Sequence, residues 1–220
     1  MLNPNSHAIG VGAMATLISN LQQTGGVKLT QFEAGRLRSR AFEQMDTGVT
    51  VFDLELGPGG SVLSATLVSG DPKLEEPADR AFSTWRFTGM PPSIVHVSAV
   101  FLFRSGHGAS GAVKAFNEPI PDAYARHHRA PFPVRIVEPG YGLDGASGGT
   151  VVLQLELTPE GVVNRVHSIV DDPEFTPSAT AAAGNWTFYI PNKHAGPQIA
   201  IAVIHFAPHP QVTSLFNGFE

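Results

Sequence analysis

The sequence predicts an α+β fold made of two tandem copies of one unit, each a small antiparallel β-sheet with a helix packed on one face. Segment Thr50–Phe87 has an ungapped counterpart at Val151–Phe188, so the sequence repeats. Both tryptophans of the chain, Trp85 and Trp186, fall on the matched position. Within each copy, apolar residues first alternate with period two and then recur at helical spacing. Such internal similarity at a fixed offset indicates a repeated supersecondary unit.

Length and composition limit the classes of protein that fit. The 220 residues suit two units of about 100 residues each. A hydrophobic content of 42% with 15% charged residues is typical of a globular chain. The formal net charge is -5 and no basic stripe occurs, so no nucleic-acid partner is expected. The absence of cysteine excludes disulfides, thiolate metal sites and cysteine nucleophiles, and it leaves the compartment open.

The predicted organisation has four parts. An N-terminal helical or irregular segment covers residues 1–47, and the first copy covers 48–104. A linker rich in glycine covers 105–130, and the second copy covers 131–220. The beginning of the second copy, Pro131–Val137, is expected to be extended.

The N-terminal part contains apolar residues at helical spacing, so a short helix is expected within residues 1–24. Lys28–Ala41 is expected to be irregular or to form a second short helix. No window reaches the roughly 18 apolar residues of a membrane span. The apolar stretch Ala8–Leu21 lacks a basic region, so it is a poor signal peptide.

Each copy opens with a predicted hairpin. Residues 51–56, VFDLEL, alternate with period two, which indicates a half-buried strand. The turns Gly57–Gly60 and Thr158–Gly161 place proline early and glycine late, as hairpin connections require. The second strand of each hairpin is predicted at Val62–Val68 and at Val163–Val170.

A helix and a final strand complete each copy. In the first copy, apolar residues with helical spacing lie at Ala78, Ala81, Phe82 and Trp85, with Leu74 at the helix entrance. The second helix is expected to be shorter, because Gly184 and Asn185 end it. The final strands are predicted at Ile94–Phe103 and Ile199–Phe206, which are rich in β-branched residues.

This order of elements resembles the C-terminal domain of TonB-type energy transducers. That pattern runs from G-x-V and a strand through a turn with D/P-x-G, a second strand, a D-P turn and an Ala-rich helix to W-x-F. The second copy matches at Gly149, Val151, Pro159, Gly161, Asp172, Pro173, Ala182, Trp186 and Phe188. The first copy matches at Gly48, Pro58, Gly60, Asp71, Pro72, Ala81, Trp85, Arg86 and Phe87.

The resemblance implies a periplasmic or otherwise extracytoplasmic protein that binds a protein or peptide partner, such as a segment of an outer-membrane receptor, by β-strand addition in energy transduction to transport. A three-stranded sheet has edges with unpaired backbone groups, and such edges bind extended peptides. The final strands are the expected edges, with partner-binding residues at Val97, Ala99, Phe101, Phe103, Ile199, Ile201 and Val203.

The exposed edges also suggest internal or intermolecular pairing. At least one edge is expected to be covered by the sister copy, by Pro131–Val137, or by a second chain in a homodimer. The alternative function is therefore a structural or self-assembling tandem domain, or the extracytoplasmic part of a sensor, without a transport role.

No enzyme and no cofactor are expected, because no acid, base or nucleophile cluster stands out. Gly145–Gly149 fits G-x-S-x-G, but a strand follows it where a nucleophile elbow needs a helix. His205 and His209 are four residues apart, yet Pro208 excludes the helix that would place them together, so no metal is expected.

Two further pairs are expected to be structural. Trp85 with Phe87, and Trp186 with Phe188, are expected to anchor the core where helix meets sheet. The equivalent residues Glu55 and Glu156 are expected on solvated strand faces, because neither has a histidine or second acid as a companion.

Overall fold

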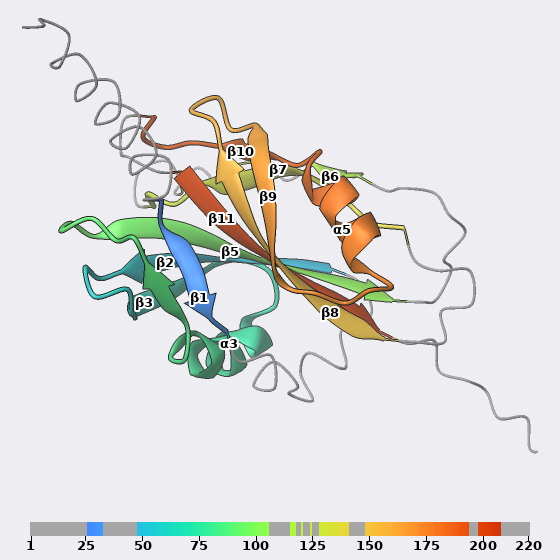
Figure 1. Cartoon of the computed structure of the whole chain (residues 1–220), viewed down its shortest axis with the longest axis horizontal. Helices are drawn as coiled ribbons and strands as arrows, with labels where there is room; N and C mark the ends of the chain where they lie inside the picture. Colours follow the sequence, from blue (N-terminus) through green and yellow to red (C-terminus); the bar gives the residue numbers. More distant parts are fainter. Residues whose placement is uncertain are drawn as a thin grey trace, which may run out of the picture.

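The computed structural model describes residues 26–32, 48–105, 115–117, 120, 124, 128–140, 148–193 and 198–207. Its fold is mixed α+β, as the sequence predicts (Figure 1). The first part contains β1 (Lys28–Gln31), β2 (Gly48–Leu56), β3 (Val62–Ser69), α3 (Glu75–Phe82), β4 (Arg86–Thr88) and β5 (Val95–Ser105). The rest contains β6 (Ala115–Asn117), β7 (Phe132–Val137), β8 (Gly149–Leu157), β9 (Val163–Val170), α5 (Thr176–Ala183), β10 (Thr187–Tyr189) and β11 (Gln198–Ala207).

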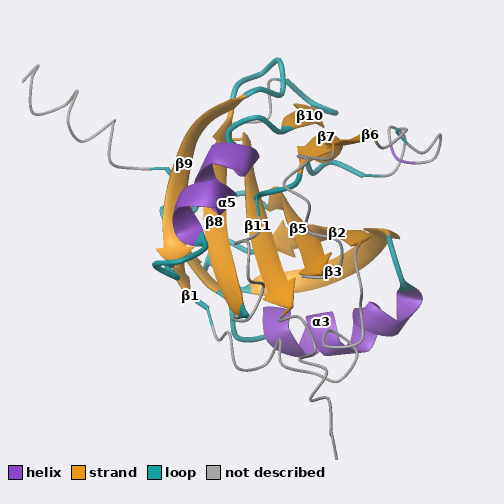
Figure 2. Cartoon of the chain, turned by 90° about the vertical axis from the view of Figure 1, so that its right-hand side faces the viewer, coloured by secondary structure: helices purple, strands orange, loops and turns teal. Residues whose placement is uncertain are grey.

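Three strands of each repeat lie in one six-stranded sheet, in the order β3-β2-β5-β11-β8-β9 (Figure 2). Two small sheets, β1-β4 and β10-β7-β6, accompany it. We refer to residues 48–105 and 149–207 as the first and second repeat. The separate small sheet expected for each repeat is not found, because the final strands β5 and β11 pair with each other in parallel.

Most of the predicted elements are confirmed, with three corrections. Residues 28–31 form a strand where an irregular segment or a helix was expected. The second helix is not shorter, since α3 and α5 both contain 8 residues. Residues 51–56 are not half-buried, because Val51 and Asp53 are buried as well. The helix expected within residues 1–24 lies outside the described residues.

The two hairpin turns have the same backbone geometry. Gly60 and Gly161 have φ values of 77° and 82°, which is the left-handed region that favours glycine. The carbonyl of Gly60 accepts a hydrogen bond from the Phe87 N–H at 2.8 Å, and that of Gly161 accepts one from the Phe188 N–H at 2.8 Å. Each glycine thus fixes the hairpin to the short strand that follows the helix.

The register between the repeats places their helices on opposite faces of the sheet. Asp53 pairs with Ser98, and its counterpart Gln154 pairs with Ile201, so Ser98 and Ile201 hold the same place in the two repeats. In the β5–β11 pair, however, Ser98 lies opposite Ala200. Successive residues of a strand point to opposite faces, so this offset of one residue inverts the second repeat relative to the first.

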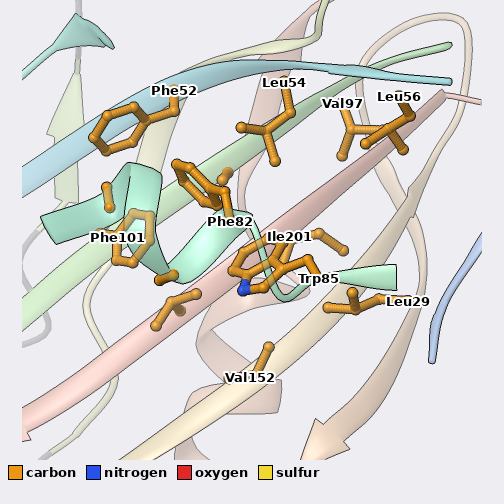
Figure 3. Packing of buried hydrophobic residues seen from close by; sticks show 14 of the residues in the cluster. Leu29, Phe52, Leu54, Leu56, Phe82, Trp85, Val97, Phe101, Val152 and Ile201 are labelled. Atoms are coloured by element: carbon orange, nitrogen blue, oxygen red, sulfur yellow. The ribbon is translucent and has the colours of Figure 1, made fainter. Parts of the chain in front are cut away.

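Two large hydrophobic cores result, and each one spans both repeats. The core on the face covered by α3 centres on Trp85 and Phe82 and includes Ile201 and Val152 of the second repeat (Figure 3). The core on the face covered by α5 centres on Trp186 and includes two residues of β5, Val100 and Leu102. All four predicted core anchors are buried, which confirms that expectation: Trp85, Phe87, Trp186 and Phe188.

The segment before each repeat lies on the face that the helix of the same repeat covers, and it packs there on strands of the other repeat. Strand β1 precedes the first repeat and contributes Leu29 to the core under α3, which extends to Val152 of β8. Strand β7 precedes the second repeat, and its Phe132 packs on Val51 of β2. The extended structure predicted for Pro131–Val137 is confirmed, and β6, within the predicted linker, pairs with β7.

Trp85→Ala should destabilise both repeats together. Loss of a fully buried aromatic ring costs roughly 3–5 kcal/mol of unfolding free energy, and the core around Trp85 includes strands of both repeats. In this variant Trp186 is the only tryptophan, so urea titration followed by its fluorescence reports on the second repeat. We expect its midpoint to fall together with the circular dichroism signal. An unchanged Trp186 midpoint would show that the repeats unfold independently.

Gly161→Ala should destabilise the protein more than Gly59→Ala does. A left-handed conformation costs a residue with a side chain roughly 1–2 kcal/mol, and a Cβ on Gly161 would lie 1.7 Å from the Phe188 carbonyl oxygen. A Cβ on Gly59 meets nothing within 4 Å, so this turn glycine is the matched control. Thermal unfolding of the two variants tests the difference. Equal melting temperatures would contradict the role given to Gly161.

Candidate functional site

The seven residues predicted to bind a partner are not at a sheet edge. Strands β5 and β11 are the two central strands, each paired on both sides. All seven side chains are buried in the core under α3: Val97, Ala99, Phe101, Phe103, Ile199, Ile201 and Val203. Both faces of these strands carry buried apolar residues, and such strands are stable only where both faces are covered. Of the three expected ways to cover these edges, the structure shows the sister repeat.

The outer strands of the six-stranded sheet are β3 and β9. In the described part of the chain, β3 pairs only with β2 and β9 pairs only with β8, apart from isolated bridges from Ser61 to Arg86 and from Val162 to Thr187. Both strands contain 8 residues. These strands therefore offer the longest edges at which another strand could add.

Each outer strand carries two irregularities at equivalent positions. In β3 the register shifts skip Leu63 and Val68, and in β9 they skip Asn164 and Ile169. Such bulges increase the local twist and are one of the means by which edge strands avoid unwanted pairing. The regular part of the β3 edge is therefore the stretch 64–67.

The two edges differ in charge. Strand β3, with the sequence VLSATLVS, has no charged residue. The positions of Ser64 and Thr66 are occupied in β9 by Arg165 and His167, which pair with Glu156 and Gln154 in the same register. Charged residues on an edge strand discourage the addition of another strand. The edge at β9 is thus protected by charge, whereas the edge at β3 is not.

Glu55 and Glu156 are equivalent in the two repeats, and their partners differ in the same way as the edges do. Glu55 accepts a hydrogen bond from the Ser64 hydroxyl at 2.9 Å. Glu156 lies 2.7 Å from His167 Nε2 and 3.9 Å from Arg165 Nη1. The expectation that no histidine accompanies these glutamates is therefore wrong for Glu156. His167 is eleven residues away in sequence and meets Glu156 only across the hairpin, so spacing along the chain did not indicate the pair.

A buried polar cluster surrounds Asp53 on the face of the first repeat that α3 does not cover. The Asp53 carboxylate lies 3.3 Å from His96 Nδ1 and 3.1 Å from His128 Nδ1. It also accepts a hydrogen bond from the backbone N–H of Arg129 at 3.4 Å. Because a carboxylate only accepts hydrogen bonds, Nδ1 carries the proton in both imidazoles. Asp53 thus joins strands β2 and β5 to the segment before β7.

Tyr124 closes this cluster. Its ring stacks on His128 with the centroids 4.7 Å apart, and its hydroxyl donates to the Ala130 carbonyl at 2.6 Å. Burial raises the pKa of Tyr124, and the negative charge of Asp53 raises it further. The phenol therefore stays neutral and acts as a donor. Ser98 adds a hydrogen bond to the carbonyl of Pro131.

The same position of the second repeat is occupied by Gln154. Its Nε2 donates to the Val27 carbonyl at 2.8 Å, and its Oε1 accepts from the Leu29 N–H at 2.9 Å. Asp53 and Gln154 each hold main chain of the segment that precedes the other repeat. Sequence reasoning missed both roles. The signal that could have indicated them is a polar residue at the middle of the apolar first strand in both copies.

The described residues contain no group of three or more His, Asp or Glu side chains that could hold a metal ion. His205 Nδ1 lies 2.9 Å from Thr150 Oγ1. His209 and most of Gly145–Gly149 are outside the described residues. Within the described ranges, no helix is both long enough and apolar enough to span a bilayer.

No family model matches the chain, and no curated protein or solved structure matches it either.

Proposed function

We propose that the chain is a non-enzymatic, extracytoplasmic protein-interaction module made of two tandem TonB-C-terminal-like units, and that it takes up an extended segment of a protein partner at β3. The proposal rests on the resemblance of each repeat to that family and on the common order of hairpin, helix, short strand and final strand in the two repeats. By the same resemblance, the partner segment belongs to an outer-membrane receptor-type protein, and its binding serves energy transduction to transport.

The observation that carries the proposal is the unequal protection of two otherwise equivalent edges. Arg165 and His167 lie on β9, and the equivalent residues on β3 are the neutral Ser64 and Thr66. In strand addition, backbone hydrogen bonds supply affinity and alternating side chains supply specificity. Leu63 is 58% exposed beside the regular stretch of β3 and supplies an apolar contact for such a segment.

A second candidate function is a structural tandem domain that pairs its own edges and has no peptide partner. The observation in its favour is the parallel pairing of β5 with β11, since these are the strands expected to bind a partner. The β3 edge distinguishes the two functions, because only the first requires that it accept a strand.

The double variant Ser64→Arg with Thr66→His should lose strand addition and keep its fold. It copies onto β3 the residues that β9 carries beside Glu156, and Glu55 is present to pair with them. We expect random ten-residue peptides displayed on phage to be enriched on the parent protein and to bind the variant at least about tenfold more weakly, which corresponds to about 1.4 kcal/mol. Surface substitutions of this kind change the unfolding free energy by about 0.5 kcal/mol or less.

The matched control is the double variant Arg165→Ser with His167→Thr, which gives β9 the neutral residues of β3. Binding at β3 predicts that this control keeps the affinity of the parent for the selected peptides. The proposal fails if the parent enriches no peptide, or if the selected peptides bind the Ser64→Arg, Thr66→His variant as tightly as the parent.

A further inference from the structure

Given strand addition at β3, on which this inference rests, we propose that the added segment alternates basic and apolar residues and directs lysine or arginine side chains at Glu55. The basis is the comparison of Glu55 with Glu156, which hold equivalent places beside the two outer strands. The second repeat contains the partners that such a glutamate takes, and the first repeat lacks them.

Strand β9 supplies the partners of Glu156, an arginine and a histidine. Arg165 lies directly opposite Glu156 in the β8–β9 register, with its Nη1 atom 3.9 Å from Oε2 of the carboxylate. His167 lies two residues further along β9 and therefore on the same face. Its Nε2 atom is 2.7 Å from Oε1 of Glu156. Both oxygens of this glutamate thus have a nitrogen partner within the same repeat.

The partners of Glu55 are different. Ser64 lies opposite it in the β2–β3 register, and the Ser64 hydroxyl donates to Oε2 at 2.9 Å. His96 lies opposite Glu55 on the other side, but the Nδ1 atom of His96 is next to Asp53, 3.3 Å away. Among the residues that the structure describes, Glu55 forms no ion pair. Its first repeat therefore supplies no cation to balance this charge, and a partner can supply one.

The alternation of β3 determines which residues of an added strand face Glu55. Ser64 and Thr66 lie on the same face of the sheet as Glu55, because directly paired residues share a face. Neighbouring strands are about 4.8 Å apart, so an added strand lies about 10 Å from β2. Serine is small, and a lysine or arginine side chain is long enough to reach over Ser64 to the carboxylate. Aspartate or glutamate at the same place would meet Glu55 as a like charge, which is unfavourable.

The remaining residues of the added strand meet the apolar face of β3. Val62, Ala65 and Leu67 are only partly buried, at the margin of the core under α3. An apolar side chain beside them extends this core, because burial of apolar area is favourable. The segment that fits the edge therefore has basic residues two positions apart, separated by apolar ones.

Peptide selection at low salt tests the inference on the intact chain. The probe is the library of random ten-residue peptides on phage, selected in about 50 mM sodium chloride, where exposed charges are weakly screened. Peptides bound at β3 are those that bind the Ser64→Arg, Thr66→His variant more weakly. In these peptides we expect lysine and arginine two positions apart at least about twofold more often than in the unselected library, and fewer acidic residues.

Substitution in the most enriched of these peptides measures the role of Glu55. Replacement of its basic residues by glutamate should weaken binding to the parent about fivefold, as expected for exposed ion pairs. The Glu55→Gln variant keeps the size of the side chain and removes its charge, so the same replacement should weaken binding less than about twofold. Glu156→Gln removes the equivalent charge beside β9 and is the matched control, which should keep the fivefold difference.

The outcomes separate this inference from the proposed function. Peptides that bind at β3 without an excess of basic residues would overturn the inference and leave strand addition standing. A fivefold difference that persists in Glu55→Gln, or that disappears in Glu156→Gln, would also overturn it, because the preference would then come from another part of the surface. If the parent enriches no peptide, the proposed function and the inference fail together.

Discussion

The parallel pairing of β5 with β11 is the interaction on which the rest of the structure depends. It joins the last strands of the two repeats along eight residue pairs, from Ser98 with Ala200 to Ser105 with Ala207. The pairing is offset by one residue from strict equivalence. Directly paired residues must point to the same face of a sheet, whereas a rotation about the strand direction turns equivalent residues to opposite faces. The offset satisfies both conditions, because each residue of β5 pairs with the neighbour of its equivalent in β11 and not with the equivalent itself.

Several features follow from that offset. Helices α3 and α5 lie on opposite faces, so each covers only part of the sheet and leaves the other repeat exposed on its side. The chain covers these areas with the segments that precede the repeats, β1 on one face and the residues before β7 on the other. The apolar surface of each repeat is therefore covered by the segment that precedes the other repeat. Stability of the two repeats is coupled because burial of apolar area, the dominant favourable term in folding, is shared between them.

The two repeats keep the same backbone and differ in side-chain chemistry. Their hairpins have the same bulges, registers and glycine turns, yet Asp53 corresponds to Gln154, and Ser64 corresponds to Arg165. A backbone set by shared packing tolerates exchange at positions where the side chain meets either solvent or a covering segment. These are the positions that give one repeat a neutral edge and a carboxylate that holds the covering segment, and the other a charged edge and an amide that holds it.

The sequence by itself determined the local elements. Four features depend only on the order of residues along the chain, so the sequence predicts them. They are the fixed offset between Trp85 and Trp186, the period-two strands, the Pro and Gly turns and the helix positions. The burial of Trp85 and Trp186 followed for the same reason. The continuous apolar runs of β5 and β11 also contained the signal of central strands, which are covered on both faces, although they were interpreted as edges.

Only the tertiary structure decided which strands became neighbours. Pairing of β5 with β11 joins residues about one hundred positions apart, and no local preference selects a partner over that distance. The same reason applies to the contacts of Asp53 with His96 and His128, and of Gln154 with Leu29. Each of these polar groups is placed by the packing of strands and segments from different parts of the chain, so the site exists only once the sheet is complete.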